Sequence, residues 1–421
     1  MIKRKLQELS ISITSGLTPL RSNSLFWVNG EVPWLKTEQL GEKYIHHTNE
    51  HISRQALENT SIRLNPENTL SIAMYGEGKT RGNLSILKKP MTTNQACCNV
   101  VIDSSKAHYE YIYYYLKTQY EELRNLSSGV RKNLNSNDIK NYPIRLPGGL
   151  DVQATIANVL KALDVKIDLN YRINAELEAM AKTLYDYWFV QFDFPDANGK
   201  PYKTSGGNMI YNLNLKRYIP EGWSNVKLNK LLTNESISVN ANQVSSDTPY
   251  TPIDYLPMKK MSFADYAPAH EANTSLIKYN QGDILIGAMR VYFHRVCIAP
   301  FNGITRSTSI VLRPKESKLL PYLYQVCNEE KTINFATKVS VGTQQPYVNW
   351  EKSLENYEIP FPFCTEIIEK YSISMNCIVN EIINREKENA YLSKLRDWLL
   401  PMLMNGQITV KQTPPLSGTC F

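Results

Sequence analysis

Asn141-Tyr142-Pro143-Ile144-Arg145-Leu146-Pro147 recurs 215 positions later as Asn356-Tyr357-Glu358-Ile359-Pro360-Phe361-Pro362, with the Asn, the Tyr, the Ile and the last Pro retained. Each copy follows a long stretch of short β-branched and aromatic runs that are broken by turns, a pattern typical of strands. Each copy then leads into a long segment with a heptad pattern. Repetition on this scale predicts two similar modules, each joined to its own helix.

The two heptad segments share one pattern, because a single offset of 215 keeps their seams in phase. The first seam is Ile156, Leu160, Leu163, Ile167, Asn170, Asn174, Leu177, Ala181, Leu184 and Trp188, and the second is Tyr371, Met375, Ile378, Ile382, Arg385, Asn389, Leu392, Arg396, Leu399 and Leu403. Apolar residues repeating every 3.5 positions are typical of a coiled coil. We expect two helices that pack antiparallel, since the chain returns through the second module, each about 58 Å long.

Four seam positions are polar: Asn170, Asn174, Arg385 and Asn389. Polar residues in a coiled-coil seam reduce stability and fix the register of the helices. The same residues also suit a locally hydrated part of a bundle where the helices splay apart. The pattern fits both interpretations.

The expected fold class is α+β with a pseudo-twofold internal repeat: two globular modules separated by two long antiparallel coiled-coil helices. The expected bounds are 1–147 for the first module, 148–217 for the first helix and its linker, 218–362 for the second module, 363–406 for the second helix and 407–421 for a flexible tail.

Composition restricts the class of protein. The chain of 421 residues has an ordinary globular balance, with 42% hydrophobic and 21% charged residues. It has no apolar run near the roughly 20 residues that cross a bilayer, and its start is unlike a secretory signal. Its seven cysteines show no CxxC pair, which favours reduced thiols in the cytoplasm over a metal site. The formal net charge is +7, and the basic excess falls mainly in residues 1–147, which suits an anionic partner.

One motif suggests an enzyme. Residues 73–80 fit a loose phosphate-binding pattern that ends in Gly78-Lys79-Thr80. Such a loop must open a helix, whereas residues 81–87 have glycine, asparagine and a strand pattern. A basic, glycine-rich turn that contacts phosphate or bases is the favoured interpretation, and nucleotide hydrolysis through Lys79 is an alternative. No other catalytic or metal-binding constellation is present in the sequence.

Several segments together resemble a known family. They are Leu184-Tyr185-Asp186-Tyr187-Trp188-Phe189-Val190-Gln191-Phe192-Asp193-Phe194-Pro195, then Gly199-Lys200-Pro201-Tyr202 with Ser205-Gly206-Gly207, and Ile219-Pro220-Glu221-Gly222-Trp223. With the in-phase repeat, they resemble the specificity subunit of type I restriction-modification systems over essentially the whole chain. The entries to the two helices, at Pro147-Gly148-Gly149-Leu150 and Phe363-Cys364-Thr365-Glu366, depart from that family's usual pattern.

The resemblance implies two target-recognition domains that each read one half of a bipartite, asymmetric DNA site. It implies that the chain is not itself an enzyme and serves in phage defence by directing adenine methylation and DNA cleavage by other subunits. Those partners would be two methyltransferase subunits that use S-adenosylmethionine and endonuclease subunits that use ATP and Mg. A repeat scaffold that binds only proteins is a further alternative.

The candidates for contact with double-stranded DNA lie in polar turns and carry basic or amide side chains. In the first module they are Lys36, Lys79, Thr80, Arg81, Arg131, Lys132 and Asn133, and in the second Arg290, Tyr292, His294, Arg295, Arg306, Lys338, Thr343, Gln344 and Gln345. Arginine and glutamine suit bidentate contacts with guanine and adenine, and lysine suits phosphate.

Overall fold

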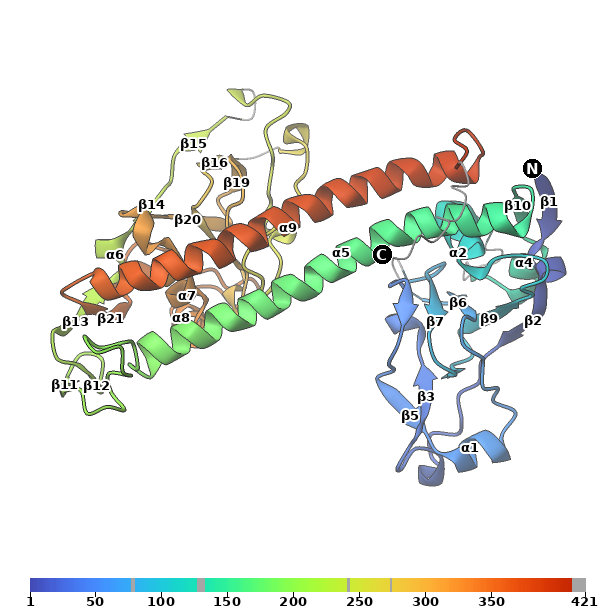
Figure 1. The fold of residues 1–421 in the computed structure, drawn as a ribbon, viewed down its shortest axis with the longest axis horizontal. Coiled ribbons are helices and arrows are strands. Elements are labelled where there is room, and N and C mark those ends of the chain that lie inside the picture. Colours follow the sequence, from blue (N-terminus) through green and yellow to red (C-terminus); the bar gives the residue numbers. More distant parts are fainter. Residues whose placement is uncertain (77–79, 127–132, 241–242, 273–274, 411–421) are drawn as a thin grey trace, which may run out of the picture. The chain divides into compact units, whose positions relative to one another are not determined.

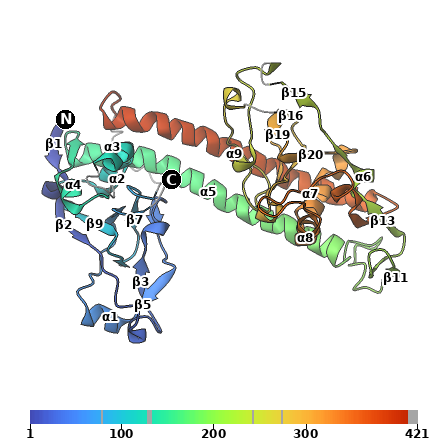
Figure 2. The same ribbon diagram turned by 180° about the vertical axis from the view of Figure 1, so that it is seen from behind.

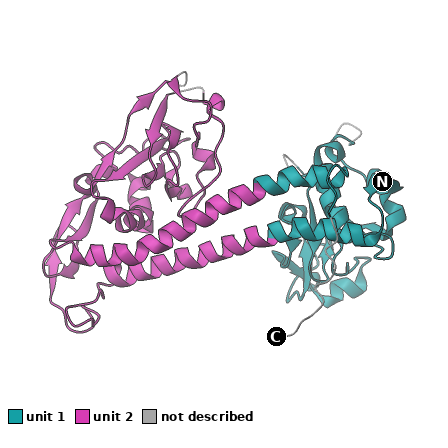
Figure 3. Ribbon diagram, turned by 45° about the horizontal axis from the view of Figure 1, so that its top comes forward, with its two compact units in different colours: residues 1–164, 394–421 teal, residues 165–393 magenta. Residues whose placement is uncertain are grey.

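The computed structural model describes residues 1–76, 80–126, 133–240, 243–272 and 275–410. The chain divides into two compact units (Figure 3). Unit 1 consists of residues 1–164 and 394–421, and unit 2 of residues 165–393. The DNA-contact candidates Lys79, Arg131 and Lys132 lie outside the described residues.

Two long helices follow the repeated heptapeptide, as predicted. α5 covers Leu150–Tyr185 and α9 covers Glu366–Met404, with 36 and 39 residues. At 1.5 Å per residue they are about 54 and about 58 Å long. α5 begins after Gly149, whose φ of +62° breaks the preceding strand, and α9 ends before Gly406, whose φ is +73°. A glycine in the left-handed region is a common helix stop, because it has no Cβ to clash.

Unit 1 contains a five-stranded sheet of order β2-β9-β6-β7-β4, a three-stranded sheet of order β5-β3-β8 and the pair β1-β10. The strands are β1 Ile2–Lys5, β2 Ser10–Ser15, β3 Val32–Leu35, β4 Tyr44–Ile45, β5 Glu50–Ile52, β6 Leu70–Ala73, β7 Leu84–Leu87, β8 Thr92–Thr93, β9 Cys97–Ile102 and β10 Pro143–Leu146. The short helices are α1 Arg54–Asn59, α2 Tyr109–Thr118, α3 Tyr120–Asn125 and α4 Ser136–Asn141. One apolar core joins β6, β7 and α2 to Ile156 and Leu160 of α5 and Leu403 of α9.

Unit 2 repeats this plan with a four-stranded sheet of order β14-β20-β17-β18, a three-stranded sheet of order β15-β16-β19 and the pairs β13-β21 and β11-β12. The strands are β11 Met209–Asn212, β12 Arg217–Pro220, β13 Trp223–Lys227, β14 Leu232–Asn234, β15 Ser238–Val239, β16 Leu276–Tyr279, β17 Ile284–Gly287, β18 Val296–Ile298, β19 Gly303–Arg306, β20 Ser309–Pro314 and β21 Glu358–Pro362. The helices are α6 Leu228–Leu231, α7 Leu320–Asn328 and α8 Glu330–Lys338.

The repeated heptapeptide forms the equivalent strand in both units. β10 pairs antiparallel with β1, and β21 pairs antiparallel with β13. A buried tyrosine of the neighbouring helix anchors each strand: Tyr111 Oη donates to Arg145 O at 2.8 Å, and Tyr322 Oη donates to Pro360 O at 2.8 Å. The expected α+β fold with two repeated modules and two long helices is confirmed.

Within unit 2, α5 and α9 lie side by side (Figures 1 and 2). They run antiparallel, because Asn170 bonds to Asn389 while Asn174, one turn further along α5, bonds to Glu386. After Tyr185, α5 continues into a π-helical turn at Asp186–Val190. The Phe189 ring of this turn lies in the core, 4.7 Å from that of Tyr322.

The chain around the phosphate-loop motif does not open a helix. The described residues that follow it, from Thr80, form a turn and enter the strand β7. This removes the helix N-terminus that phosphate binding requires. Even the two long helices lack an apolar stretch that would span a bilayer, within the described part of the chain.

Candidate nucleic-acid interface

Two turns meet at one edge of the β14-β20-β17-β18 sheet in unit 2. Residues 290–295 connect β17 to β18, and residues 340–346 follow α8. Arg290 N donates to Pro346 O at 2.7 Å, and the Arg290 guanidinium lies within 3.5 Å of Gln344 O. The fold thus brings together two groups of predicted DNA-contact residues that are some 50 positions apart in the sequence.

The second of these turns presents polar side chains to solvent. Thr343, Gln344 and Gln345 are all exposed, as is Lys338 at the end of α8. Glutamine side chains in such a position can donate and accept together, which matches the edge of adenine. An exposed lysine nearby suits a phosphate contact.

The first turn presents two aromatic rings. Tyr292 is 49% exposed and Phe293 is 40% exposed, with their ring centroids 5.0 Å apart. Tyr292 is among the predicted DNA contacts, whereas Phe293 is not. The available signal was an aromatic pair, Tyr292-Phe293, inside a hairpin turn that is flanked by basic residues.

The same turn is held in an unusual backbone conformation. Arg290 and His294 flank it with φ values of 51° and 57°, in the left-handed region that non-glycine residues rarely adopt. Conformations of this kind cost about 1–3 kcal/mol each and persist where surrounding contacts impose them. Here Lys259 N donates to His294 O at 2.8 Å, in addition to the bond between Arg290 and Pro346.

Two predicted contacts of this turn have polar atoms that are engaged within unit 2. His294 is only 5% exposed, and its Nε2 lies 2.8 Å from Asn328 Oδ1. The Arg295 guanidinium donates to Ile253 O at 2.9 Å and also to Leu256 O. We therefore reassign His294 and Arg295 to support of the turn, because their polar atoms are engaged inside unit 2.

Arg306 lies at the end of β19 with an exposed side chain. The next residue, Ser307, accepts a hydrogen bond from Tyr347 Oη at 2.9 Å. Since Tyr347 directly follows the 340–346 turn, the end of β19 lies at the same corner of unit 2 as the two turns.

Unit 1 has the same backbone frame at the corresponding place. Leu134 N donates to Met74 O at 3.1 Å, and 214 positions later Val348 N donates to Ala288 O at 3.0 Å. Of the described candidates on this frame, Thr80, Arg81 and Asn133 are all half-buried. The frame is common to both units, whereas the residues that it presents differ.

Lys36 lies at the end of β3 and is engaged within unit 1. Its ammonium forms an ion pair with Glu50 and lies 3.7 Å from Glu38. The hydrogen bond to Glu50 raises the pKa of Lys36, so the side chain stays charged. Arg21 pairs with the same Glu50 at 2.6 Å and lies over the Trp27 ring at 3.7 Å. This basic and aromatic group was not foreseen from the sequence.

The polar seam positions form direct bonds between the long helices. Asn170 Nδ2 lies 2.8 Å from both Asn389 Oδ1 and Glu388 Oε2, and Asn174 Nδ2 lies 2.9 Å from Glu386 Oε1. These contacts favour the register interpretation over a splayed bundle. Arg385 differs, because its guanidinium pairs at 2.9 Å with Glu381 of its own helix.

None of the predicted seam positions is exposed. The buried ones are Ile156, Leu160, Ile167, Asn170, Asn174, Ala181, Tyr371, Met375, Ile382, Asn389 and Leu403, and the half-buried ones are Leu163, Leu177, Leu184, Trp188, Ile378, Arg385, Leu392, Arg396 and Leu399. Arg396 Nη1 reaches Asp164 of α5 at 3.1 Å, within unit 1.

Within the described residues, no group of three or more His, Cys, Asp or Glu side chains is placed to hold a metal ion. The interface candidates are therefore polar turns, exposed aromatic rings and basic side chains. That combination suits nucleic-acid binding, in which backbone contacts position the protein and contacts with base edges specify the sequence.

Sequence comparison identifies the class of protein. Residues 2–179 match the family described as type I restriction modification DNA specificity domain. The predicted resemblance to type I specificity subunits is confirmed by this match and by a relative of that class that aligns over nearly the whole chain.

One relative spans nearly the whole chain and another a part of it. The type I restriction enzyme MjaIX specificity subunit of Methanocaldococcus jannaschii is 27% identical over 97% of this chain and 94% of its own length. The EcoR124I/EcoR124II specificity subunit of Escherichia coli is 23% identical over 43% of this chain and 45% of its own length. The crystal structure of a type I S subunit from M. genitalium superposes with a TM-score of 0.59 at 18% identity, covering 98% of this chain and 96% of that one, and so has the same fold.

Proposed function

We propose that each unit reads one half of a bipartite, asymmetric DNA site through its pair of turns. The observation that carries this proposal is the shared frame at Met74–Leu134 and Ala288–Val348, which presents different residues in the two units. A common scaffold with different contact residues suits two related but unequal DNA sequences.

The long helices are proposed to set the unread spacer between the half-sites. Half-sites read from one face of B-DNA are one helical turn, about 34–36 Å, apart or a multiple of that distance. Helices of 36 and 39 residues are long enough to set such a distance. Their interhelical asparagine contacts would fix the register on which this length depends.

Chemistry is assigned to partner subunits and not to this chain. By analogy with the class, two methyltransferase subunits would supply S-adenosylmethionine-dependent adenine methylation, and endonuclease subunits would supply cleavage driven by ATP and Mg. A nucleotide hydrolase that uses the Lys79 loop is disfavoured, because the chain after it enters a strand. A protein-binding scaffold predicts no sequence-specific DNA binding.

The contact residues are tested by substitution in the second unit. Gln344→Ala and Gln345→Ala, made in the complex with its methyltransferase subunits, should weaken discrimination at one or two base pairs by about 1–3 kcal/mol each. Methylated adenines are mapped across a library of randomised sites. Discrimination in the other half-site should be unchanged.

Two controls accompany this experiment. Gln243→Ala removes an exposed glutamine from a different loop of unit 2 and should leave both half-sites intact. Replacing residues 1–147 with the first module of another specificity subunit should alter only one half-site. Altered bases in both halves after that exchange would rule out modular recognition.

A further inference from the structure

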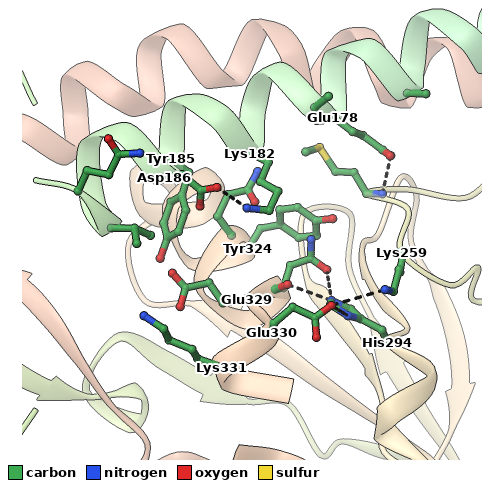
Figure 4. A pocket seen from close by; sticks show the side chains of 17 residues that line it. Glu178, Lys182, Tyr185, Asp186, Lys259, His294, Tyr324, Glu329, Glu330 and Lys331 are labelled. Carbon is green, nitrogen blue, oxygen red and sulfur yellow. Dashed lines mark hydrogen bonds and ion pairs between the residues drawn. The ribbon is translucent and has the colours of Figure 1, made fainter. Parts of the chain in front are cut away.

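Unit 2 contains a cavity of about 670 Å³ on the side of α5 that faces α7 and α8 (Figure 4). α5 lines it with Ala175, Glu178, Ala179 and Lys182, and α7 and α8 line it with Tyr324 and Glu330 among others. A cavity of this size suits a small organic molecule, since such sites commonly measure 300–1,000 Å³ and combine apolar walls with a few polar groups.

Most of the charged groups in the wall are already paired. Lys182 forms an ion pair with Asp186 one turn further along the chain. Lys259 lies 3.5 Å from Glu330, and His294 Nδ1 lies 3.7 Å from the same carboxylate. Lys182 and Lys259 thus each have a carboxylate partner in the wall, which Lys331 also lines.

Two carboxylates of the wall differ from the rest. Among the residues that the structure describes, neither Glu178 nor Glu329 forms an ion pair, and both are only partly accessible. Glu178 Oε1 accepts a hydrogen bond from Met261 N at 2.7 Å, and Glu329 is hydrogen-bonded by the hydroxyl of Tyr185. Both hydrogen-bond partners are neutral, and within the described part of the chain Lys260 and Lys331 act on the two carboxylates without forming an ion pair with them.

Burial raises the pKa of Glu178 to about 7 and also raises the pKa of Glu329. Lys260 acts on Glu178, and Lys331 acts on Glu329, in the direction that lowers these values, but burial has the larger effect. A carboxylate that is removed from water without a counter-charge is stabilised by any cation that reaches it.

We propose that this cavity binds an aliphatic diamine or polyamine, with one ammonium group on Glu178 and another on Glu329. The methylene chain would lie against Ala175, Ala179 and the Tyr324 ring, which supply the apolar part of the wall. A metal ion fits less well, because no group of three or more His, Cys, Asp or Glu side chains is placed to hold one among the described residues.

The test uses the full-length chain without DNA, so that a polyamine has no other polyanion to bind. Isothermal titration calorimetry is performed with a series of α,ω-diamines of increasing length, with spermidine and with butylamine. We expect saturable binding that is strongest at one chain length and at least about tenfold weaker for the monoamine, because the monoamine engages only one carboxylate.

Charge-neutral variants test the two carboxylates that are proposed to bind the ammonium groups. Glu178→Gln and Glu329→Gln keep a hydrogen-bond acceptor for Met261 N and Tyr185, so the fold is expected to persist, as circular dichroism and thermal unfolding would show. Each should weaken diamine binding about tenfold or more. The matched control Glu381→Gln removes an exposed carboxylate of α9 outside the cavity and should change nothing.

The pH dependence is a separate readout. Lys260 and Glu386 both act on Glu178, and the net pKa near 7 means that its carboxylate becomes charged between pH 6 and pH 8. Diamine affinity should rise about tenfold over this range and should lose that rise in Glu178→Gln. The absence of saturable binding, equal binding of the monoamine, or binding unaffected by both substitutions would each overturn the proposal.

Discussion

Asn170 and Asn389 lie fully inside the seam between the long helices, at 0% and 2% exposure. Their mutual hydrogen bond leaves Asn170 Oδ1 and Asn389 Nδ2 without a partner among the described protein atoms. A buried polar atom without a partner costs about 1–3 kcal/mol. A chain with leucine at both positions would be more stable. The asparagines are therefore better explained by a role in fixing the register of the two helices than by a contribution to stability.

This explanation predicts a specific pattern in a double-mutant cycle. Asn389→Ala should lower the free energy of unfolding by about 1–3 kcal/mol, since it removes a partner of Asn170. The double variant Asn170→Leu with Asn389→Leu should be more stable than either single leucine variant. Urea denaturation of the full chain measures the stability of all four variants.

The control is Asn376→Ala, an exposed asparagine on the same helix, which should change stability by less than about 0.5 kcal/mol. Strict additivity of the two leucine substitutions would contradict a direct interaction between Asn170 and Asn389.

At the scale of elements, one carboxylate of α5 holds a loop of the second module. Glu178 Oε1 accepts from Met261 N at 2.7 Å, and this loop also carries Lys259, whose backbone N–H bonds to the turn at His294. Burial raises the pKa of Glu178 from an ordinary value of 4.5 to about 7. Folding therefore favours the protonated form of this side chain.

The sign of the pH dependence of stability follows from the linkage between folding and proton binding by Glu178. The stabilisation from protonated Glu178 is complete below pH 4.5, declines as the pH rises and is lost above about 7. Burial likewise raises the pKa of Glu386, so this carboxylate acts in the same direction. Relative to wild type, Glu178→Gln should gain up to about 3 kcal/mol of stability between pH 5 and pH 8.

Urea unfolding of the two proteins at several pH values measures this difference. Glu176→Gln serves as the control, since Glu176 is an exposed carboxylate of the same helix α5. A constant difference between wild type and Glu178→Gln across the range would mean that Glu178 does not titrate there.

At the scale of the whole molecule, the two units repeat both their strands and their hydrogen bonds. Met74 N donates to Ala96 O at 2.8 Å in unit 1, and Ala288 N donates to Thr308 O at 2.9 Å in unit 2. The proposed function requires two similar units, each connected to a long helix, so that the helices set the spacing between the two DNA half-sites.

A matched deletion tests this function of the helices. The bond between Asn170 and Asn389 sets the pairing, so removing residues 168–174 from α5 and residues 385–391 from α9 deletes facing heptads. Seven residues at 1.5 Å correspond to roughly 10 Å, or about 3 base pairs. Mapping of methylated sites should show a shorter unread spacer with both half-sites unchanged.

Deleting only residues 168–174 provides the control, because it leaves the second helix without a facing partner over one heptad. This variant should lose stability and site recognition together. A matched double deletion that keeps the original spacer would refute the measuring role of the helices.

Much of the fold was predictable because its signals are periodic. The heptad seams, the 215-residue offset and the strand-forming heptapeptide each depend on residues close together in the chain, so they identify both long helices and the repeat. Gly149, at the start of α5, and Gly406, after the end of α9, interrupt the pattern where a left-handed backbone is needed.

The candidate interface was predictable only in part. Composition and turn signals select polar residues such as Gln344, but they do not distinguish a side chain that faces solvent from one that is engaged by the fold. Arg295 has the same basic character as Arg290, yet its guanidinium donates to the carbonyls of Ile253, Asp254 and Leu256. That distinction depends on which distant segment lies beside each residue.

Local sequence therefore determined the repeat, the two long helices and their polar seam, because periodicity and turn chemistry act over a few residues. Only the tertiary structure decided which turns meet, which basic side chains are engaged and where the cavity with Glu178 and Glu329 forms. Those outcomes depend on contacts between segments that are tens to hundreds of residues apart, whose energies come from burial and pairing and leave no periodic trace in the chain.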